Sequence, residues 1–312
     1  FESNHIKMCC LCCHKGGGRI VITDKFDEKK FDWKTFLGIK QKFIDENIKG
    51  IIDPRCDGCF NLVKRGWDDN EKYISYIHFN HWTRCNCDCV YCYTNWDKKN
   101  FNTKPYYNVF PVIKKLFEEK LFRPGGEITF AGGEPTILKD FDKLILYMLK
   151  NGADRITIHS SGIKYSKGIE KGIKEKKVSV CLSADSGDKD MYKKIKRVDK
   201  FDIFWKNAKK YAKAQPDDNK KLVETKFILI PEFNSTKEQI DKWIDLNIET
   251  GIKSIVLDIE DVYCQDLRNK KKQIPEYLVD LCGYIIEKAK EYKLNLVEYN
   301  NFRYLIEEYH LV

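Results

Sequence analysis

Three closely spaced cysteines carry the strongest chemical signal in this sequence. Cys85, Cys89 and Cys92 follow the spacing Cys-x3-Cys-x2-Cys, and thiolates so close on one loop can bind three irons of a [4Fe–4S] cluster. Protein clusters of this type normally have four cysteine ligands, so the fourth iron would stay open to a small molecule. The alternatives are a partial zinc site, although zinc favours paired Cys-x2-Cys knuckles, and a buried cysteine cluster. Cys87 breaks the spacing, and we interpret it as a non-ligand.

A glycine-rich turn follows the second expected strand, residues 127–131. Its residues are Gly132, Gly133, Glu134 and Pro135. Adjacent glycines let the backbone approach a ligand closely, although such a tetrapeptide alone could be an ordinary turn. The turn comes one helix after the cysteine triplet, and a βαβ unit brings the ends of successive parallel strands to one edge of the sheet. We therefore treat the two motifs as halves of one site.

Together with Tyr91, which precedes the third cysteine, the two motifs resemble the signature of the radical S-adenosylmethionine (SAM) superfamily. The resemblance implies that the open iron binds the amino and carboxylate groups of SAM. The reduced cluster then cleaves SAM to methionine and a 5′-deoxyadenosyl radical, which abstracts hydrogen from a substrate. It also implies that Tyr91 and the turn 132–135 contact the cofactor, the turn through the methionine amino group.

Further polar residues lie at or near the ends of the later strands. By the same resemblance, Ser183 and Asp185 hydrogen-bond the ribose and carboxylate of SAM, and a carboxylate on ribose hydroxyls is familiar from dinucleotide sites. Lys226 and Asp258 are weaker candidates for contacts with SAM or substrate. His159 is a third, although such a histidine is more often structural than an acid or base.

From Tyr73 onward, strand-like runs alternate with helix-like stretches, which indicates an α/β fold with a parallel sheet and right-handed crossovers. The expected strands are residues 73–82, 127–131, 155–160, 178–185, 222–230 and 254–260. The expected helices are residues 109–121, 141–149, 166–174, 201–213, 237–248 and 274–293. A doubly wound sheet or a barrel would satisfy this pattern, and the family resemblance selects the partial (β/α)6 radical SAM barrel.

Several expected strands alternate polar and apolar residues, whereas parallel strands buried on both faces are usually continuous apolar runs. The polar positions are Glu127, Thr129, Thr157, His159, Cys181, Ser183, Asp185, Glu224, Lys226, Asp258 and Glu260. If the apolar faces pack on the helices, these side chains line a cavity. The alternative is a solvent-exposed polar face on a half-covered sheet.

We expect three parts in the chain: a Cys-rich α+β module at residues 1–72, the barrel at 73–265, and a helical and strand extension at 266–312 that closes the barrel. The cysteines of the first part are Cys9, Cys10, Cys12, Cys13, Cys56 and Cys59. Four thiolates suit zinc or a complete [4Fe–4S] cluster. The arrangement resembles the twitch-type auxiliary-cluster modules of some radical SAM proteins. We therefore expect a second [4Fe–4S] cluster on four of these six residues, with a structural zinc as the alternative.

The remaining cysteines have a weaker interpretation. Cys264 and Cys282 are too few to bind a cluster of their own. Cys181 and Cys264 could donate a hydrogen atom to a substrate radical, but a small buried apolar residue is the commoner role of a free cysteine.

The composition is that of a soluble protein in a reducing compartment. The chain has 312 residues, 42% of them hydrophobic, which suffices for one large or two smaller domains. No run approaches the roughly 18 apolar residues of a membrane span, and no segment near the start resembles a signal peptide. Its 13 cysteines are concentrated in two regions, which favours cluster or metal binding in the cytoplasm over disulfides. The net charge of +9 comes from lysines scattered among acidic residues, so we do not expect nucleic acid as a partner.

A peptide is the expected substrate, because relatives with twitch-type modules often modify ribosomally made peptides. Residues 19–23 could dock a peptide by strand addition. A flavodoxin or ferredoxin would supply the electron. The alternatives are a sugar, nucleotide or other small metabolite as substrate, a glycyl-radical activase, and a non-enzymatic zinc-knuckle binding protein.

Overall fold

The computed structural model of the chain describes residues 6–7, 21–23, 27, 29–54, 73–92, 105–231, 233–269 and 271–308. The six cysteines predicted to bind a second cluster, Cys9, Cys10, Cys12, Cys13, Cys56 and Cys59, lie outside the described residues. By its internal contacts the chain divides into two compact units. The first comprises residues 1–84, 102–133 and 147–156, and the second comprises residues 85–101, 134–146 and 157–312.

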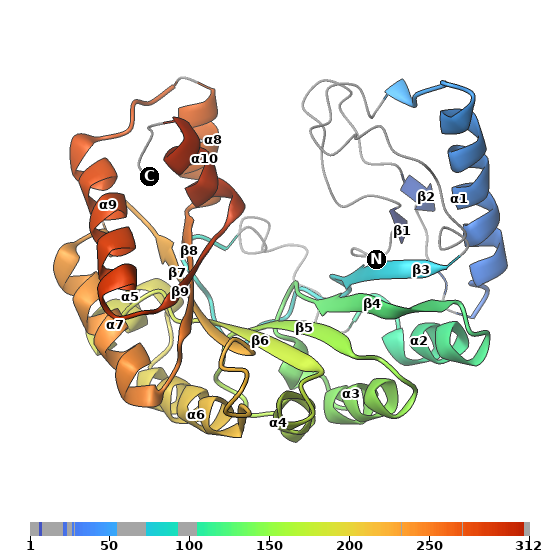
Figure 1. Ribbon diagram of the computed structural model, residues 1–312, viewed down its shortest axis with the longest axis horizontal. Helices are drawn as coiled ribbons and strands as arrows, with labels where there is room; N and C mark the ends of the chain where they lie inside the picture. The colour runs from blue at the N-terminus through green and yellow to red at the C-terminus, as the bar shows by residue number, and fades with distance from the viewer. Residues whose placement is uncertain are drawn as a thin grey trace. The chain divides into compact units, whose positions relative to one another are not determined.

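Seven strands of the described residues form one sheet whose order follows the sequence (Figure 1). They are β3 (Ile74–Phe79), β4 (Phe122–Phe130), β5 (Arg155–Ser160), β6 (Val178–Ser183), β7 (Val223–Leu229), β8 (Ser254–Ile259) and β9 (Asn295–Glu298). The sheet is parallel and helices connect its strands, so the predicted α/β fold is confirmed. β9, which pairs with β8, is a seventh strand beyond the six expected. Within residues 19–23, which we expect to dock a peptide by strand addition, Val21–Thr23 form β2, paired antiparallel with β1 (Ile6–Lys7).

The helices include the six that were expected after residue 73 and three that were not. They are α1 (Trp33–Ile48), α2 (Val109–Glu118), α3 (Phe141–Lys150), α4 (Lys167–Lys174), α5 (Lys189–Lys196), α6 (Phe201–Ala214), α7 (Lys237–Thr250), α8 (Asp261–Arg268), α9 (Glu276–Glu291) and α10 (Asn300–Glu308). The unexpected helices α5, α8 and α10 have only eight or nine residues and few apolar positions. Side-chain caps define two of them: Asp188 accepts from the first turn of α5 and Glu260 from that of α8.

The first unit has an aromatic and aliphatic core. Phe79 of β3 and Phe130 of β4 stack with ring centroids 5.2 Å apart, and both are fully buried. Val112, Ile113 and Leu116 of α2 are fully buried as well. The indole N–H of Trp33 donates to the Val112 carbonyl oxygen at 3.1 Å, which joins α1 to α2.

The second unit is built around strands β6, β7 and β8 with helices packed on them. α4 contacts β6 and α6, and α6 contacts β7. Figure 1 shows α4 and α6 next to each other. Buried hydrogen bonds connect β7 to α7. The Thr225 hydroxyl donates to the Asn247 side-chain oxygen at 2.6 Å and accepts from the Trp243 indole N–H at 3.0 Å. These bonds let Thr225 lie on the buried face of a strand without an unsatisfied hydroxyl.

The predicted alternation of polar and apolar residues is present on β6 and β7, whereas on β8 only Asp258 is half-buried, and Glu260, predicted to continue this strand, caps α8 instead. Leu182, Val223 and Phe227 are fully buried, whereas Glu224 and Lys226 are half-buried. In the strand register, Cys181 lies beside Glu224 and Ser183 beside Lys226, so the polar residues form one face. That this face lines a cavity stays a prediction.

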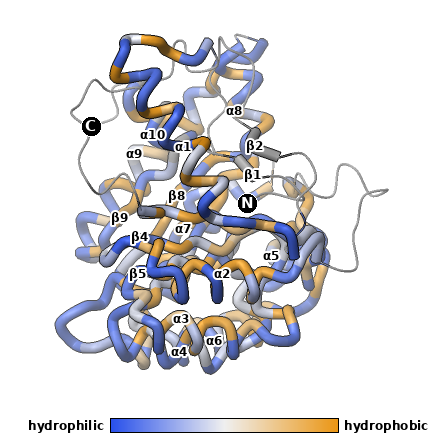
Figure 2. Tube along the Cα trace, turned by 90° about the vertical axis from the view of Figure 1, so that its right-hand side faces the viewer, coloured by the Kyte–Doolittle hydropathy of each residue, from blue (hydrophilic) through white to orange (hydrophobic). Residues whose placement is uncertain are grey.

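The helices are amphipathic rather than uniformly apolar. Figure 2 shows hydrophilic residues distributed along them. None of the helices in the described part of the chain is long and apolar enough to cross a membrane.

Candidate active site

The site begins with residues 85–92, which we call the cysteine loop; it follows the carboxyl end of β3. The thiols of Cys85, Cys89 and Cys92 are half-buried, and Cys87 is buried. A backbone hydrogen bond of 3.1 Å from Cys92 to the Cys89 carbonyl closes a tight turn at the end of the loop. The three cysteines of the predicted spacing are therefore more accessible than the fourth.

Cys87 differs from Cys85 and Cys89 in the direction in which its pKa is shifted. Its backbone N–H donates to the Cys85 sulfur at 3.4 Å. Hydrogen bonding from the Cys87 thiol lowers the pKa of the Cys85 thiol, and it lowers the pKa of Cys89 to about 6. The single proton of the Cys87 thiol is shared between these two sulfurs, and this sharing, together with burial, raises the pKa of Cys87. Cys87 thus stays protonated and helps its neighbours to be thiolates, the form that binds metal.

The adjacent glycines are required because backbone passes directly against them. A Cβ on Gly133 would lie 2.1 Å from the Arg84 carbonyl oxygen. Gly132 has φ +96°, and a Cβ there would lie 2.0 Å from the Asn80 side-chain oxygen. The Gly133 N–H also donates to the Trp82 carbonyl at 2.6 Å. The segment that leads into the cysteine loop therefore packs on this turn, a role that we did not predict for it.

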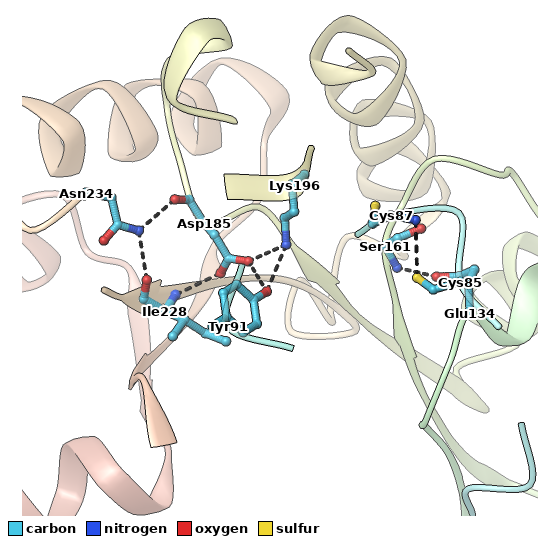
Figure 3. A network of polar contacts seen from close by, with 9 residues as sticks. All are labelled: Cys85, Cys87, Tyr91, Glu134, Ser161, Asp185, Lys196, Ile228 and Asn234. Atoms are coloured by element: carbon cyan, nitrogen blue, oxygen red, sulfur yellow. Dashed lines mark hydrogen bonds and ion pairs between the residues drawn. The ribbon is translucent and has the colours of Figure 1, made fainter. Parts of the chain in front are cut away.

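Glu134 ties the turn after β4 to the end of β5 (Figure 3). Its carboxylate is 1% exposed and accepts hydrogen bonds from the Thr136 N–H at 3.0 Å and the Thr136 hydroxyl at 2.6 Å. It also accepts from the Ser160 hydroxyl at 2.9 Å and the Ser161 N–H at 2.5 Å. The Ser161 hydroxyl then donates to the Asn86 side chain at 2.8 Å, which anchors the first half of the cysteine loop.

Asp185 anchors the second half of the loop (Figure 3). It has φ +56° and no exposed surface, and its carboxylate accepts from the Tyr91 hydroxyl at 2.5 Å and pairs with the Lys196 ammonium. Its other oxygen accepts from the Ile228 N–H at 2.8 Å, and its carbonyl oxygen accepts from the Asn234 amide at 2.9 Å. The carboxylate thus joins the cysteine loop, α5 and β7.

The comparison with protein families shows to which family this chain belongs. The model of the radical SAM superfamily matches residues 79–246, more than half of the 312 residues. The chain belongs to the radical SAM superfamily. The match contains the cysteine loop, the Gly-Gly-Glu-Pro turn and Asp185, so the resemblance expected from these motifs is confirmed.

Individual relatives agree with this family. GTP 3',8-cyclase of Clostridium botulinum (strain Okra / Type B1) is 33% identical over 134 residues, 42% of this chain and 41% of that protein. The 7,8-dihydro-6-hydroxymethylpterin dimethyltransferase of Methanocaldococcus jannaschii is 30% identical over 138 residues, 44% of this chain and 25% of that protein. The chain thus spans about two-fifths of the first relative's length and about a quarter of the second's.

Solved structures share the fold. Streptococcus suis SuiB bound to S-adenosylmethionine has a TM-score of 0.53 and 14% identity, with 88% of this chain and 69% of that chain covered. SuiB bound to its precursor peptide SuiA has a TM-score of 0.54 and 15% identity, with 84% and 62% covered. At these identities the likeness shows the fold, which is that of radical SAM enzymes.

The cysteine loop of this radical SAM protein fits a [4Fe–4S] cluster by its donors. It offers three half-buried thiols, two of which have a lowered pKa. Among the described residues, no three His, Cys, Asp or Glu side chains converge closely enough to hold a single metal ion. A cluster takes one thiolate for each iron and does not need such convergence. Three thiols on one loop therefore fit three irons of such a cluster.

Two of the three weaker candidates lie together on the polar face of β7 and β8. The Lys226 ammonium lies 5.5 Å from the centre of the Tyr299 ring. Burial raises the pKa of Asp258 to about 6, against the opposing effect of Lys226. His159 is half-buried on β5. A half-buried lysine and a carboxyl that titrates near neutral pH could bind the polar groups of a ligand.

The described cysteines outside the cysteine loop differ from Cys85 and Cys89 in pKa. Burial raises the pKa values of Cys181, Cys264 and Cys282 to about 12, so these thiols are protonated. Cys264 and Cys282 are 0% exposed, which agrees with small residues of the core. Cys181 is 3% exposed on the polar face of β6.

Four residues of the site were missed in the sequence: Asn86, Ser161, Lys196 and Asn234. Lys196 is one of three basic residues in the last turn of α5, and nothing in its immediate neighbours marks it. It lies four residues after the buried Tyr192 and directly after the buried Ile195, so the buried face of α5 would have identified it had the helix been predicted. Asn86 and Ser161 are polar residues within or next to predicted motifs, but their pairing depends on the tertiary fold.

Proposed function

We propose that this chain is the catalytic part of a radical SAM enzyme that reductively cleaves SAM and abstracts hydrogen from a substrate. The observation that carries the proposal is the cysteine loop, with three half-buried thiols, a fourth that acidifies two of them, and anchors on both halves. When bound and reduced, the cluster supplies one electron to SAM, which yields methionine and a 5′-deoxyadenosyl radical.

The residues of the chain have separate tasks in this proposal. Cys85, Cys89 and Cys92 hold the cluster. The backbone of residues 132–135, Tyr91 and Ser183 orient SAM. The protein contributes orientation and exclusion of side reactions, because the cofactor supplies the radical.

For the substrate we propose a peptide. The two-stranded sheet of β1 and β2 offers short strands to which an extended peptide could add, a mode in which backbone hydrogen bonds provide affinity. SuiB, which shares the fold, has a structure in complex with its precursor peptide. Fold alone does not define a substrate, so this part of the proposal needs its own test.

A nucleotide or pterin is the second candidate. It is favoured by the sequence relatives, which include GTP 3',8-cyclase and a pterin dimethyltransferase at 33% and 30% identity. The half-buried Lys226 and Asp258 on the polar face are groups that could bind the phosphate and ring nitrogens of such a ligand.

We also propose a second [4Fe–4S] cluster on four of the six cysteines between residues 9 and 59, within a module at residues 1–72. The barrel would comprise residues 73–265 and the extension residues 266–312. A flavodoxin or ferredoxin in the cytoplasm would be the electron donor. Iron analysis tests the second cluster: about eight irons per chain are expected, and about four irons together with bound zinc would contradict it.

The test of the function is the formation of 5′-deoxyadenosine. The protein is reconstituted with iron and sulfide under anaerobic conditions, reduced with dithionite and incubated with SAM. We expect 5′-deoxyadenosine from the wild type and from Cys282→Ala, which removes a buried thiol outside the loop, but none from Cys89→Ala. A fully loaded and reduced wild type that forms no product would refute the proposal. Deuterium transfer from labelled peptides or nucleotides into 5′-deoxyadenosine then identifies the substrate class.

A further inference from the structure

Backbone hydrogen bonds attach the cysteine loop to the last turn of helix α5. The Asp88 N–H donates to the Lys196 carbonyl at 3.1 Å, and the Val90 N–H donates to the Ile195 carbonyl at 3.0 Å. Outside these bonds, the Arg197 guanidinium lies 3.3 Å from the Asp88 carboxylate. Carbonyls at the end of a helix have no partner within the helix, so the loop satisfies them and is held by them.

The side chain of Lys196 turns inward from the same place (Figure 3). It is 1% exposed, whereas Lys193 and Lys194 on the same helix are exposed. Its ammonium donates to the Tyr91 hydroxyl at 3.0 Å and pairs with the Asp185 carboxylate, and it lies 5.4 Å from the centre of the Tyr91 ring. Burial alone would lower the pKa of Lys196, but Asp185 holds it well above its usual value, so the lysine is charged.

Holding a loop with a buried ion pair costs free energy, because both charges must be removed from water. Well-packed apolar residues of similar volume are often as stable as a buried ion pair or more so. The pair also lies at Tyr91, directly before Cys92 and two residues after Cys89, where a charge acts through a medium of low dielectric. Its position therefore points to an electrostatic role beyond packing.

We propose that Lys196 is a positioning residue for the cysteine loop and that its buried positive charge makes the cluster bound there easier to reduce. This inference rests on the proposed function, because it needs a cluster on Cys85, Cys89 and Cys92. Reduction adds one electron from an external reductant such as dithionite and therefore one negative charge to the cluster. A fixed positive charge stabilises the reduced form, and the charges around iron–sulfur clusters are among the factors that set their reduction potentials.

The test is a redox titration of the reconstituted protein followed by electron paramagnetic resonance, without SAM. Lys196→Met should lower the equilibrium constant for reduction at least tenfold, which is about 59 mV for one electron. All variants are titrated at the same pH, the lowest at which the cluster is stable, so that Lys196 stays protonated without the carboxylate that raises its pKa. Asp185→Asn should then change the equilibrium constant in the opposite direction, because it leaves the charged lysine uncompensated. Lys194→Met is the matched control, since it removes the same charge from the same helix at an exposed position; we expect less than a twofold change.

Opposite signs for the two variants distinguish an electrostatic role from a structural one, which would disturb the cluster in the same direction in both. If Lys196→Met alone fails to bind iron, the double variant Asp185→Asn/Lys196→Met is compared with Asp185→Asn, and we expect the lower equilibrium constant in the double variant. Equal potentials in that comparison, or in Lys196→Met and wild type, overturn the inference. A wild type that binds no cluster on the loop overturns the proposed function itself.

Discussion

Glu134 gives the most direct test of how the site is held together. Its carboxylate accepts four hydrogen bonds in a fully buried position, three on one oxygen and one, from the Ser161 N–H, on the other. In Glu134→Gln the amide oxygen can keep the first three, but the NH2 group then faces the Ser161 N–H. One charge-assisted hydrogen bond is lost, at about 1.5–3 kcal/mol, and a buried N–H loses its acceptor, so we expect the free energy of unfolding to fall by about 2–4 kcal/mol.

The assay is urea unfolding of the cluster-free protein, followed by circular dichroism. Glu127→Gln is the matched control, because Glu127 lies on the preceding strand and pairs with Arg155 at 3.2 Å on the surface. An exposed pair of this kind contributes about 0–1 kcal/mol. Equal losses in the two variants would refute the reasoning, since they would show that the hydrogen bonds of Glu134 contribute no more than a surface ion pair.

Three further predictions concern single residues of the site and its surroundings. Cys87→Ala should keep the wild-type iron content per chain and raise the pKa of Cys89, measured by thiol alkylation of the cluster-free protein, because the Cys87 thiol donates to Cys89; loss of iron in this variant would make Cys87 a ligand. Burial raises the pKa of Asp258 to about 6, so the folded state takes up this proton at a higher pH than the unfolded chain does. Ionisation of Asp258 at neutral pH therefore costs stability, and Asp258→Asn should exceed the wild type in free energy of unfolding by up to about 3 kcal/mol at pH 7 and lose this advantage by about pH 4; a pH-independent difference would contradict it. Gly133→Ala forces a Cβ against backbone and should lower the free energy of unfolding by more than about 3 kcal/mol, measured by thermal or urea unfolding. Gly38→Ala, with nothing within 4 Å on the exposed side of α1, should raise the free energy of unfolding by about 1 kcal/mol. Similar effects of both substitutions would contradict the close packing at Gly133.

Elements with a strong periodic pattern could be predicted from the sequence. The runs 155–160 and 254–260 matched β5 and β8 to within a residue, because β-branched residues alternate there or form an apolar run. α5 and α10 were missed, since helices of eight and nine residues are too short to show a clear periodic pattern. β9 was also missed, and its four residues are all half-buried rather than alternating between buried and exposed.

For the site, the sequence identified the residues that bear chemistry but not those that hold them. A spacing such as Cys-x3-Cys-x2-Cys records local geometry, so it can be recognised without the fold. The contact of Ser161 with Asn86 joins residues 75 positions apart, and that of Lys196 with Tyr91 joins residues 105 positions apart. Such contacts leave no local pattern, because each partner is an ordinary polar residue in its own segment.

The structure at the end of β6 assigns different roles to Ser183 and Asp185, which the sequence analysis had given the same role. A carboxylate offers about four lone-pair positions, and three of those of Asp185 are already used by Tyr91, Lys196 and the Ile228 N–H. Its side chain is 0% exposed, so a ribose could reach it only by displacing one of these partners and leaving a buried group unpaired. Ser183 lies two residues earlier on the same face and is half-buried. Of the two residues expected to bind SAM, Ser183 is therefore the one we expect to touch the ribose, while Asp185 acts on the cofactor through the loop that it holds.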